Sequence, residues 1–227
     1  MSIRKKDVSE KASRPGGRRR EEQRFLQLAA QLAEIGKIFY GRGWALGTSG
    51  NFSAIVSREP LRLAITATGV DKGALTPADI LQIDEAGKVV RGSGRPSSES
   101  RVHLAVVNLF EAGAVLHTHS VWSTIISECC AAQGGVALED YEMLKGLEGV
   151  VTQQHREWLP ILENLCDVAG QARVVEATLR QHPTAHGFLL RRHGLYTWGQ
   201  GLSEAKRHVE ILEFLLEVLG RSRTAGC

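Results

Sequence analysis

The stretch Ala114-Val115-Leu116-His117-Thr118-His119 begins with three apolar residues and ends in two histidines separated by one residue. The apolar triplet predicts a short buried strand, and residues i and i+2 of a strand point to the same face of a sheet. The two imidazoles therefore converge from one rigid element, as the ligands of a metal ion must. Catalytic zinc typically takes three protein ligands and leaves one position open, so a third ligand has to come from elsewhere in the chain.

His193 is the best candidate for the third ligand. It follows the apolar run Phe188–Leu190 and precedes Gly194, so it too is predicted at a strand end. A His-x-His pair alone is weak evidence for a metal, and the third strand-end histidine, with acids available, favours a metal site. The other histidines are predicted to be surface or hydrogen-bonded structural residues: His103, His155, His182, His186 and His208.

The rest of the chain intersperses short apolar strands with amphipathic helices. Apolar residues at helical spacing predict helices over 21–40, 97–112, 120–131, 140–147, 170–181 and 203–219. Runs rich in Ile, Val and Leu predict strands over 52–56, 61–67, 80–83, 114–117, 185–190 and 194–198. Hairpin-like turns join several strands, and no linker or repeat interrupts them. We therefore expect an α/β (α+β-like) fold: a single catalytic domain over 21–222, with a central, mainly antiparallel sheet flanked by helices.

Composition and charge narrow the class of protein. The chain has 227 residues, of which 43% are hydrophobic and 23% charged, as in ordinary globular proteins. No apolar run approaches the roughly 18 residues that span a bilayer, and the N-terminus lacks the apolar core of a secretory signal. The four cysteines show no framework spacing. We expect a cytoplasmic protein with no membrane partner and no disulfide scaffold.

Basic residues are concentrated at the N-terminus. Residues 1–20 carry eight basic and two acidic side chains, a net +6, which leaves −3 for the remainder of a chain whose total is +3. This segment contains Pro15-Gly16-Gly17 and few apolar residues, so it is predicted to be a disordered basic tail. Weak binding of a polyanion by the tail is the alternative interpretation. The mildly acidic remainder gives no indication of nucleic-acid binding.

Three loops combine small residues, hydroxyls and accessible backbone amides, which suit an anion. They are Gly47-Thr48-Ser49-Gly50-Asn51, Thr66-Ala67-Thr68-Gly69 and Pro96-Ser97-Ser98-Glu99, the last at a predicted helix start where N–H groups are free. Taken singly, they are also typical of turns and of an ordinary helix cap. None matches a nucleotide-binding motif. Lys72 and Arg191 lie near enough in sequence to assist an anion, although solvated surface charges are the simpler interpretation.

The order of these pieces resembles the class II aldolase family over nearly all of residues 23–220. Its motifs are the three loops above, His117-Thr118-His119 and His193-Gly194. The resemblance implies a lyase acting on a small sugar phosphate, a mainly antiparallel sheet layered by helices, and a homotetramer with active sites at subunit interfaces. It also implies one zinc ion per subunit held by His117, His119 and His193, and a glutamate base near the metal at Glu99. Substrate phosphate would be bound by Asn51, Thr68, Gly69, Ser97 and Ser98.

Within the family, two segments resemble a dehydratase branch that acts on a ketose 1-phosphate. They are Tyr141-Glu142-Met143-Leu144-Lys145-Gly146 and the run from Arg191 to Gly199. The match implies Glu142 as the acid/base; on sequence pattern alone Glu142 is an ordinary helical surface acid. The alternatives are a sugar-phosphate aldolase, to which Glu99 also fits, a pentulose-phosphate 4-epimerase, or a non-catalytic scaffold. The presence of all three histidines argues against the scaffold.

Overall fold

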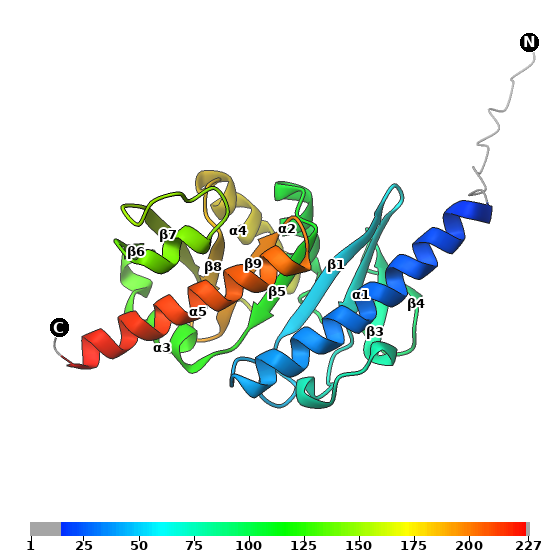
Figure 1. Cartoon of the computed structure of the whole chain (residues 1–227), viewed down its shortest axis with the longest axis horizontal. Coiled ribbons are helices and arrows are strands. Elements are labelled where there is room, and N and C mark those ends of the chain that lie inside the picture. Colours follow the sequence, from blue (N-terminus) through cyan, green and yellow to red (C-terminus); the bar gives the residue numbers. More distant parts are fainter. Residues whose placement is uncertain (1–14, 226–227) are drawn as a thin grey trace, which may run out of the picture.

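The computed structural model describes residues 15–225 (Figure 1). The α-helices of this part are α1 (Pro15–Gly41), α2 (Ser100–Phe110), α3 (Val121–Cys129), α4 (Val168–Gln181) and α5 (Leu202–Ala225). The strands are β1 (Asn51–Arg58), β2 (Leu61–Thr66), β3 (Ile80–Asp84), β4 (Val89–Arg91), β5 (Ala114–Thr118), β6 (Gly135–Glu139), β7 (Arg156–Leu162), β8 (Gly187–Leu190) and β9 (Gly194–Gly199). Short 3-10 helices lie at η1 (Lys72–Ala74), η2 (Pro77–Asp79), η3 (Ala131–Gln133) and η4 (Glu142–Gly146).

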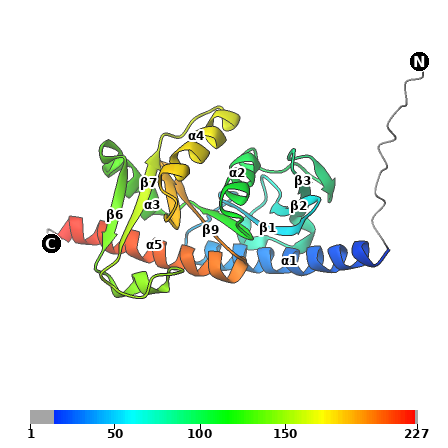
Figure 2. The same ribbon diagram turned by 90° about the horizontal axis from the view of Figure 1, so that it is seen from above.

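The strands form one sheet in the order β4-β3-β2-β1-β5-β9-β8-β7-β6. Every neighbouring pair is antiparallel except β7 and β8. The helices α1 and α5 run along one side of this sheet, and α2 and α4 lie on the opposite side (Figure 2). The expected mainly antiparallel sheet flanked by helices is confirmed.

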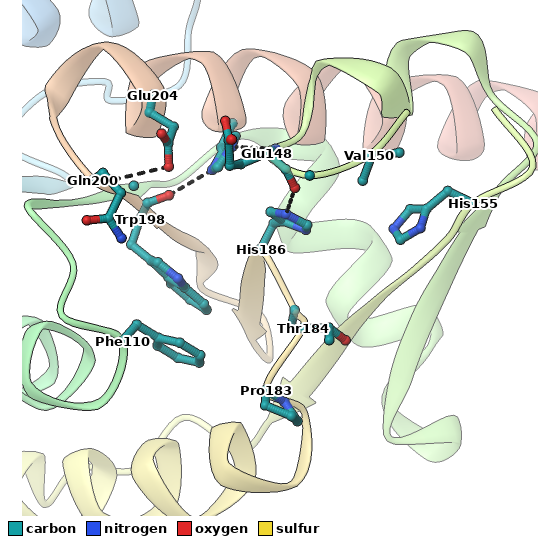
Figure 3. Close-up of a pocket in the computed structure, with 14 residues that line it drawn as sticks. Phe110, Glu148, Val150, His155, Pro183, Thr184, His186, Trp198, Gln200 and Glu204 are labelled. Atoms are coloured by element: carbon teal, nitrogen blue, oxygen red, sulfur yellow. Dashed lines mark hydrogen bonds between the residues drawn. The ribbon is translucent and has the colours of Figure 1, made fainter. Parts of the chain in front are cut away.

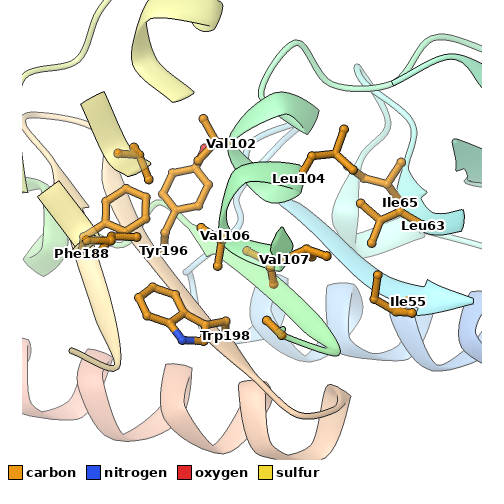
Figure 4. Packing of buried hydrophobic residues seen from close by; sticks show 14 of the residues in the cluster. Ile55, Leu63, Ile65, Val102, Leu104, Val106, Val107, Phe188, Tyr196 and Trp198 are labelled. Atoms are coloured by element: carbon orange, nitrogen blue, oxygen red, sulfur yellow. The ribbon is translucent and has the colours of Figure 1, made fainter. Parts of the chain in front are cut away.

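Each layer buries its own apolar cluster. Between the sheet and α2, the large rings of Phe188, Tyr196 and Trp198 pack against Val102 and Val106 (Figure 4). A second cluster lies under α1, and a third lies under the C-terminal half of α5 together with α3 and η4. Burial of this apolar surface is the main favourable term in folding and holds the strand ends in place.

One row of paired residues crosses four strands and leads to the predicted metal site. Asn51 on β1 pairs with His117 on β5, His117 pairs with Tyr196 on β9, and Tyr196 pairs with Phe188 on β8. The rings of this row stack: Phe188 and Tyr196 have centroids 4.8 Å apart, and Tyr196 and His117 have centroids 3.8 Å apart. Aromatic pairs contribute about 0.5–1.5 kcal/mol each beyond area burial. The stack therefore fixes the plane of the His117 imidazole.

Several predicted boundaries were wrong. Helix α1 begins at Pro15, so residues 15–20 of the expected disordered tail are helical; Arg18, Arg19 and Arg20 are good helix formers and extend the amphipathic helix that follows. The part of that tail over 1–14 lies outside the described residues. The helix expected from residue 97 begins at Ser100, with Glu99 as its N-cap residue. Strands β6 and β7 were not predicted at all. Within residues 15–225, no helix combines the length and the apolar character that a membrane span requires.

Candidate active site

Three histidines gather at one edge of the sheet. His117 is the penultimate residue of β5, His119 follows that strand, and His193 lies in the turn between β8 and β9. The Nε2 atom of His117 is 2.8 Å from Nε2 of His119 and 3.3 Å from Nε2 of His193. Suitable ligand atoms of all three residues lie within 4.8 Å of one another. Among the described residues, this is the group whose geometry suits a metal ion.

The protonation of these histidines also suits a metal. Nδ1 of His117 donates to the backbone oxygen of Leu195 at 2.9 Å, so Nε2 presents its lone pair to the cluster. Burial and the neighbouring histidines hold the pKa of His117 well below its usual value. Burial, with His193 and Lys72, lowers the pKa of His119 to about 3. Two nitrogens bound tetrahedrally at zinc–nitrogen distances of about 2.0–2.1 Å lie about 3.3 Å apart, which matches the separation of His117 and His193.

Glu99 lies directly beside the histidines. Its Oε1 atom is 3.5 Å from Nε2 of His193, and its Oε2 atom is 3.7 Å from Nε2 of His117. The side-chain amide of Asn51 donates to Oε2 at 2.7 Å. The carboxyl group is only about one-fifth exposed, so the structure brings Glu99 to the edge of the candidate metal site.

The three loops that were predicted to bind an anion meet at one cavity beside Glu99. They enclose a cavity of about 210 Å³ that His119 also lines. The predicted residues Asn51, Thr68, Ser97 and Ser98 line this cavity, whereas Gly69 lies one residue beyond its lining with a φ of 76°. Ser98 and Thr68 are exposed, and Ser98 lies just before the N-terminus of α2, where free N–H groups favour an anion.

The side chain of Asn51 makes more hydrogen bonds within the protein than the sequence indicates. Its side-chain nitrogen donates to Ser97 Oγ at 3.2 Å as well as to Glu99, and its oxygen faces the ring of His103. Both amide hydrogens are thus occupied. In this arrangement the side chain of Asn51 holds Glu99 and Ser97 rather than a ligand.

Lys72 is a buried residue, so its interpretation as a solvated surface charge was wrong. Only 1% of it is exposed, and its Nζ atom donates to the backbone oxygens of Thr48 and Val70 at 3.1 and 2.9 Å. Burial lowers its pKa, and Asp71 opposes this. Lys72 therefore ties together the loops on two sides of the cavity. Arg191, in contrast, pairs with Glu128 and Glu163.

Glu142 is separate from this group within a single chain. It begins η4, which packs against α5, and its side chain is 72% exposed. It forms an ion pair with Lys145. Within residues 15–225, no hydrogen bond or ion pair joins Glu142 to the three histidines.

His103 and Tyr196 belong to the site, although the sequence did not single them out as functional. His103 is fully buried and bonds to Asn51, while Tyr196 stacks on His117. A signal for His103 was available: it lies four residues after Glu99, so both occupy the same face of α2. Tyr196 could be found only from the pairing of β5 with β9.

A larger cavity of about 430 Å³ lies at the opposite end of the β8–β9 pair (Figure 3). Next to it, both ring nitrogens of His186 face acceptors: Nδ1 is 2.9 Å from Glu157 Oε2, and Nε2 is 2.8 Å from the backbone oxygen of Glu148. Burial alone would lower the pKa of His186, but the hydrogen bond and charge of Glu157 raise it. Glu157 also bonds to His155. This arrangement fits the predicted structural role of these histidines.

A histidine cluster at strand ends, a carboxylate beside it and a small polar cavity define a candidate metal-dependent enzyme on a mainly antiparallel sheet. The chain belongs to the family described as class II aldolase and adducin N-terminal domain, whose model matches residues 30–219. The resemblance found in the sequence is thereby confirmed.

Particular relatives and solved structures agree with this assignment. The chain is 43% identical over 192 residues to the methylthioribulose-1-phosphate dehydratase of Pseudomonas savastanoi pv. phaseolicola, covering 84% of this chain and 93% of that protein. It is 42% identical over 195 residues to the enzyme of the same name from Methylococcus capsulatus, with coverages of 86% and 93%.

Among solved structures, a putative aldolase/epimerase/decarboxylase from Escherichia coli matches with a TM-score of 0.72 at 24% identity, covering 87% of this chain and 90% of that chain. The L-fuculose-1-phosphate aldolase from Thermus thermophilus matches with a TM-score of 0.68 at 26% identity, covering 92% and 98%. The chain has the class II aldolase fold.

Proposed function

We propose that this chain is a zinc-dependent dehydratase that converts 5-methylthioribulose 1-phosphate into 5-methylthio-2,3-dioxopentyl phosphate and water, a step of methionine salvage. The observation that carries the proposal is the cluster of three histidines beside a small polar cavity with Glu99 at its edge. The identity of about 40% to enzymes named methylthioribulose-1-phosphate dehydratase supports this substrate over other sugar phosphates.

The metal would be held by His117, His119 and His193. Bound zinc supplies a cationic centre that stabilises the negative charge developing on the substrate carbonyl oxygen, an effect worth several kcal/mol. The lowered pKa values of His117 and His119 support this assignment, because a cation can bind only unprotonated imidazole nitrogens.

The phosphate of the substrate would lie in the cavity between the three loops. Thr68 and Ser98 offer exposed hydroxyl groups, and Gly69 and the N-terminus of α2 offer backbone amides. Asn51 and Ser97 are buried and would shape the cavity from behind. A phosphate bound in this cavity would leave the reacting carbons of a ketose 1-phosphate close to the histidines, since His119 also lines the cavity.

The reaction needs an acid/base group. Loss of water from the substrate removes a proton from C3 and the hydroxyl group from C4, and the resulting enol rearranges to the diketone. We assign the removal of the C3 proton, and its transfer to the departing hydroxyl, to Glu142. One carboxyl group can serve both steps if it lies within about 2.6–3.2 Å of each position.

Because Glu142 is exposed, we infer that its acid/base role depends on the assembly of this chain with other subunits. A carboxylate that is 72% exposed and outside its own chain's cluster can act if a neighbouring subunit's cavity faces it. We therefore propose a homotetramer with active sites at subunit interfaces, one zinc ion per subunit, and a cytoplasmic location. The absence of a candidate membrane helix in the described part is consistent with this location.

A sugar-phosphate aldolase is the second candidate, and the position of Glu99 favours it. Its carboxylate lies 3.5 Å from Nε2 of His193, where it could act on a substrate held at the metal. An aldolase would break a carbon–carbon bond instead of expelling water.

Two matched variants separate these functions. We expect Glu142→Gln in the zinc-loaded protein to abolish turnover of 5-methylthioribulose 1-phosphate, followed by the absorbance of the diketone, while zinc content stays at one per chain. Chelation of the metal should abolish turnover reversibly. Full formation of the diketone by Glu142→Gln combined with complete loss in Glu99→Gln would contradict the assignment of Glu142 and move the acid/base role to Glu99. Cleavage of a ketose 1-phosphate into two fragments, retained in Glu142→Gln and lost in Glu99→Gln, would favour the aldolase.

A further inference from the structure

We propose that His103 is a positioning residue: it fixes the amide of Asn51 and, through it, the Glu99 carboxylate at the edge of the metal site. The kinetic part of this inference rests on the proposed function. Its geometric part depends only on the fold.

A continuous chain of hydrogen bonds runs from Ser53 through His103 and Asn51 to Glu99. Ser53 Oγ lies 2.7 Å from Nδ1 of His103, and Nε2 of His103 lies 2.5 Å from Oδ1 of Asn51. The side-chain nitrogen of Asn51 then donates to Oε2 of Glu99 at 2.7 Å. Ser53 and His103 are completely buried and Asn51 is 4% exposed, so burial protects the hydrogen bonds among these three residues from water.

The donor and acceptor roles in this chain are determined. A carboxylate only accepts, so Asn51 must present its NH₂ group to Glu99 and its oxygen to His103. Nε2 of His103 must then carry the proton and donate to that oxygen. Nδ1 is left with a lone pair, which accepts the hydroxyl hydrogen of Ser53 at 2.7 Å in preference to the backbone oxygen of Val115 at 3.4 Å. Burial agrees with a neutral ring, because it lowers the pKa of His103 to about 3.

The hydrogen bonds of His103 give it a role beyond packing in the core. Without a donor at the position of Nε2, the oxygen of Asn51 is left buried and unpaired, which costs about 1–3 kcal/mol. Rotation of the amide would relieve that cost but would turn the oxygen of Asn51 toward Glu99, where two acceptors repel. Either outcome displaces the carboxylate from its position near His117 and His193.

The site's architecture supports a role that ends at Glu99. His103 and Glu99 lie one helical turn apart on α2, and Asn51 pairs with His117 across β1 and β5. The chain of hydrogen bonds thus couples Glu99, the N-cap residue of α2, to β1, and β1 pairs with the strand that carries His117. Residues that orient groups at a metal site typically change affinity or activity by 10–100-fold when replaced.

Two polar replacements of His103 form the test. The amide nitrogen of glutamine can reach the position of Nε2 and donate to Asn51, whereas asparagine reaches only the position of Nδ1. We expect His103→Asn to lower kcat by about 10–100-fold and His103→Gln to stay within about threefold of the wild type. In both variants, KM and the zinc content should change little. Equal losses in both variants, or no loss in either, would overturn the proposal.

Two further measurements do not depend on the substrate. Solid-state ¹⁵N spectra of the full chain with labelled histidine, assigned by the signal missing in His103→Gln, should show a neutral ring protonated at Nε2 between pH 5.5 and 8. A ring protonated at Nδ1, or one that titrates in this range, contradicts the inference.

The visible spectrum of the cobalt-substituted protein should change in His103→Asn and be retained in His103→Gln, because the first variant alone displaces Glu99. An unchanged spectrum in His103→Asn counts against the role of His103. If the wild type fails to turn over the substrate while the ¹⁵N and cobalt results are as expected, the proposed function fails and the positioning role stands.

Discussion

Glu213 on α5 is a buried acid that contacts β5, the strand that carries His117. Thr118, which lies between the two strand-end histidines, donates to its Oε1 atom at 2.5 Å, and its Oε2 atom has no hydrogen-bond partner among the described residues. Burial raises the pKa of Glu213 from 4.5 to about 7, the nearby hydroxyl groups of Ser120 and Thr118 oppose this rise, and the charge of Glu217 adds to it. We therefore predict that the ionisation of Glu213 makes the stability of the fold depend on pH.

The sign and size of the effect follow from proton linkage. Between pH 4.5 and about 7 the folded chain binds a proton at Glu213 that the unfolded chain has lost, so the free energy of unfolding falls as pH rises through this range. Above pH 7 both states are ionised and the fall stops. A displacement of this size corresponds to about 3 kcal/mol. Glu213→Gln stays neutral at every pH and should lack this loss.

Urea denaturation of the metal-free protein at pH 5 and pH 8, at one fixed protein concentration, measures the effect. Fixed concentration is needed because assembly contributes to apparent stability. We expect the free energy of unfolding of the wild type, relative to Glu213→Gln, to fall by about 2–3 kcal/mol between these pH values. Glu85→Gln, on an exposed turn, is the control and should keep the wild-type dependence. If Glu213→Gln parallels the wild type at both pH values, Glu213 is ionised in the fold and the reasoning fails.

Two further predictions concern the metal site and the second histidine cluster. His119→Ala removes a proposed ligand but little buried apolar surface, so elemental analysis should find zinc well below one per chain and activity should fall by more than about 100-fold. Retention of full zinc would contradict the ligand assignment. Glu157→Gln leaves His186 without its buried partner and should destabilise the fold by about 3 kcal/mol in urea denaturation at pH 6. Because the pKa of His186 is raised in the fold, the stability from its charge is lost as pH rises through that pKa, so the cost should be smaller at pH 9. An equal cost at both pH values would show that the charge of His186 plays no part.

The sequence could predict the parts of the site whose geometry depends on residues close together in the chain. The spacing of His117 and His119 on a strand determines their common direction, and His193 has the same signature of an apolar run before a tight turn. The loops at Gly47–Asn51 and Thr66–Gly69 were recognised by composition and order. Their meeting in one cavity follows from the antiparallel pairing of β1 with β2 and β5.

The parts that sequence could not predict depend on contacts between distant segments. Strand β7 contains Pro160, which weakens a strand pattern, and its partner β6 is only five residues long. The burial of Lys72 results from packing between two loops and α1, and no local pattern encodes it. Glu142 is a surface acid by every local measure, and only its match to a family segment gives it a role.

The proposed reaction is the loss of one water from 5-methylthioribulose 1-phosphate, and the mass of the product tests it most directly. The zinc-loaded chain is incubated with 5-methylthioribulose 1-phosphate, and the mass of the phosphorylated product is measured by mass spectrometry. We expect a single product that is lighter than the substrate by one water. The wild type should form it, and no product should form in the presence of a chelator. Two smaller fragments from cleavage of a carbon–carbon bond, or an unchanged mass with zinc at one per chain, would contradict it.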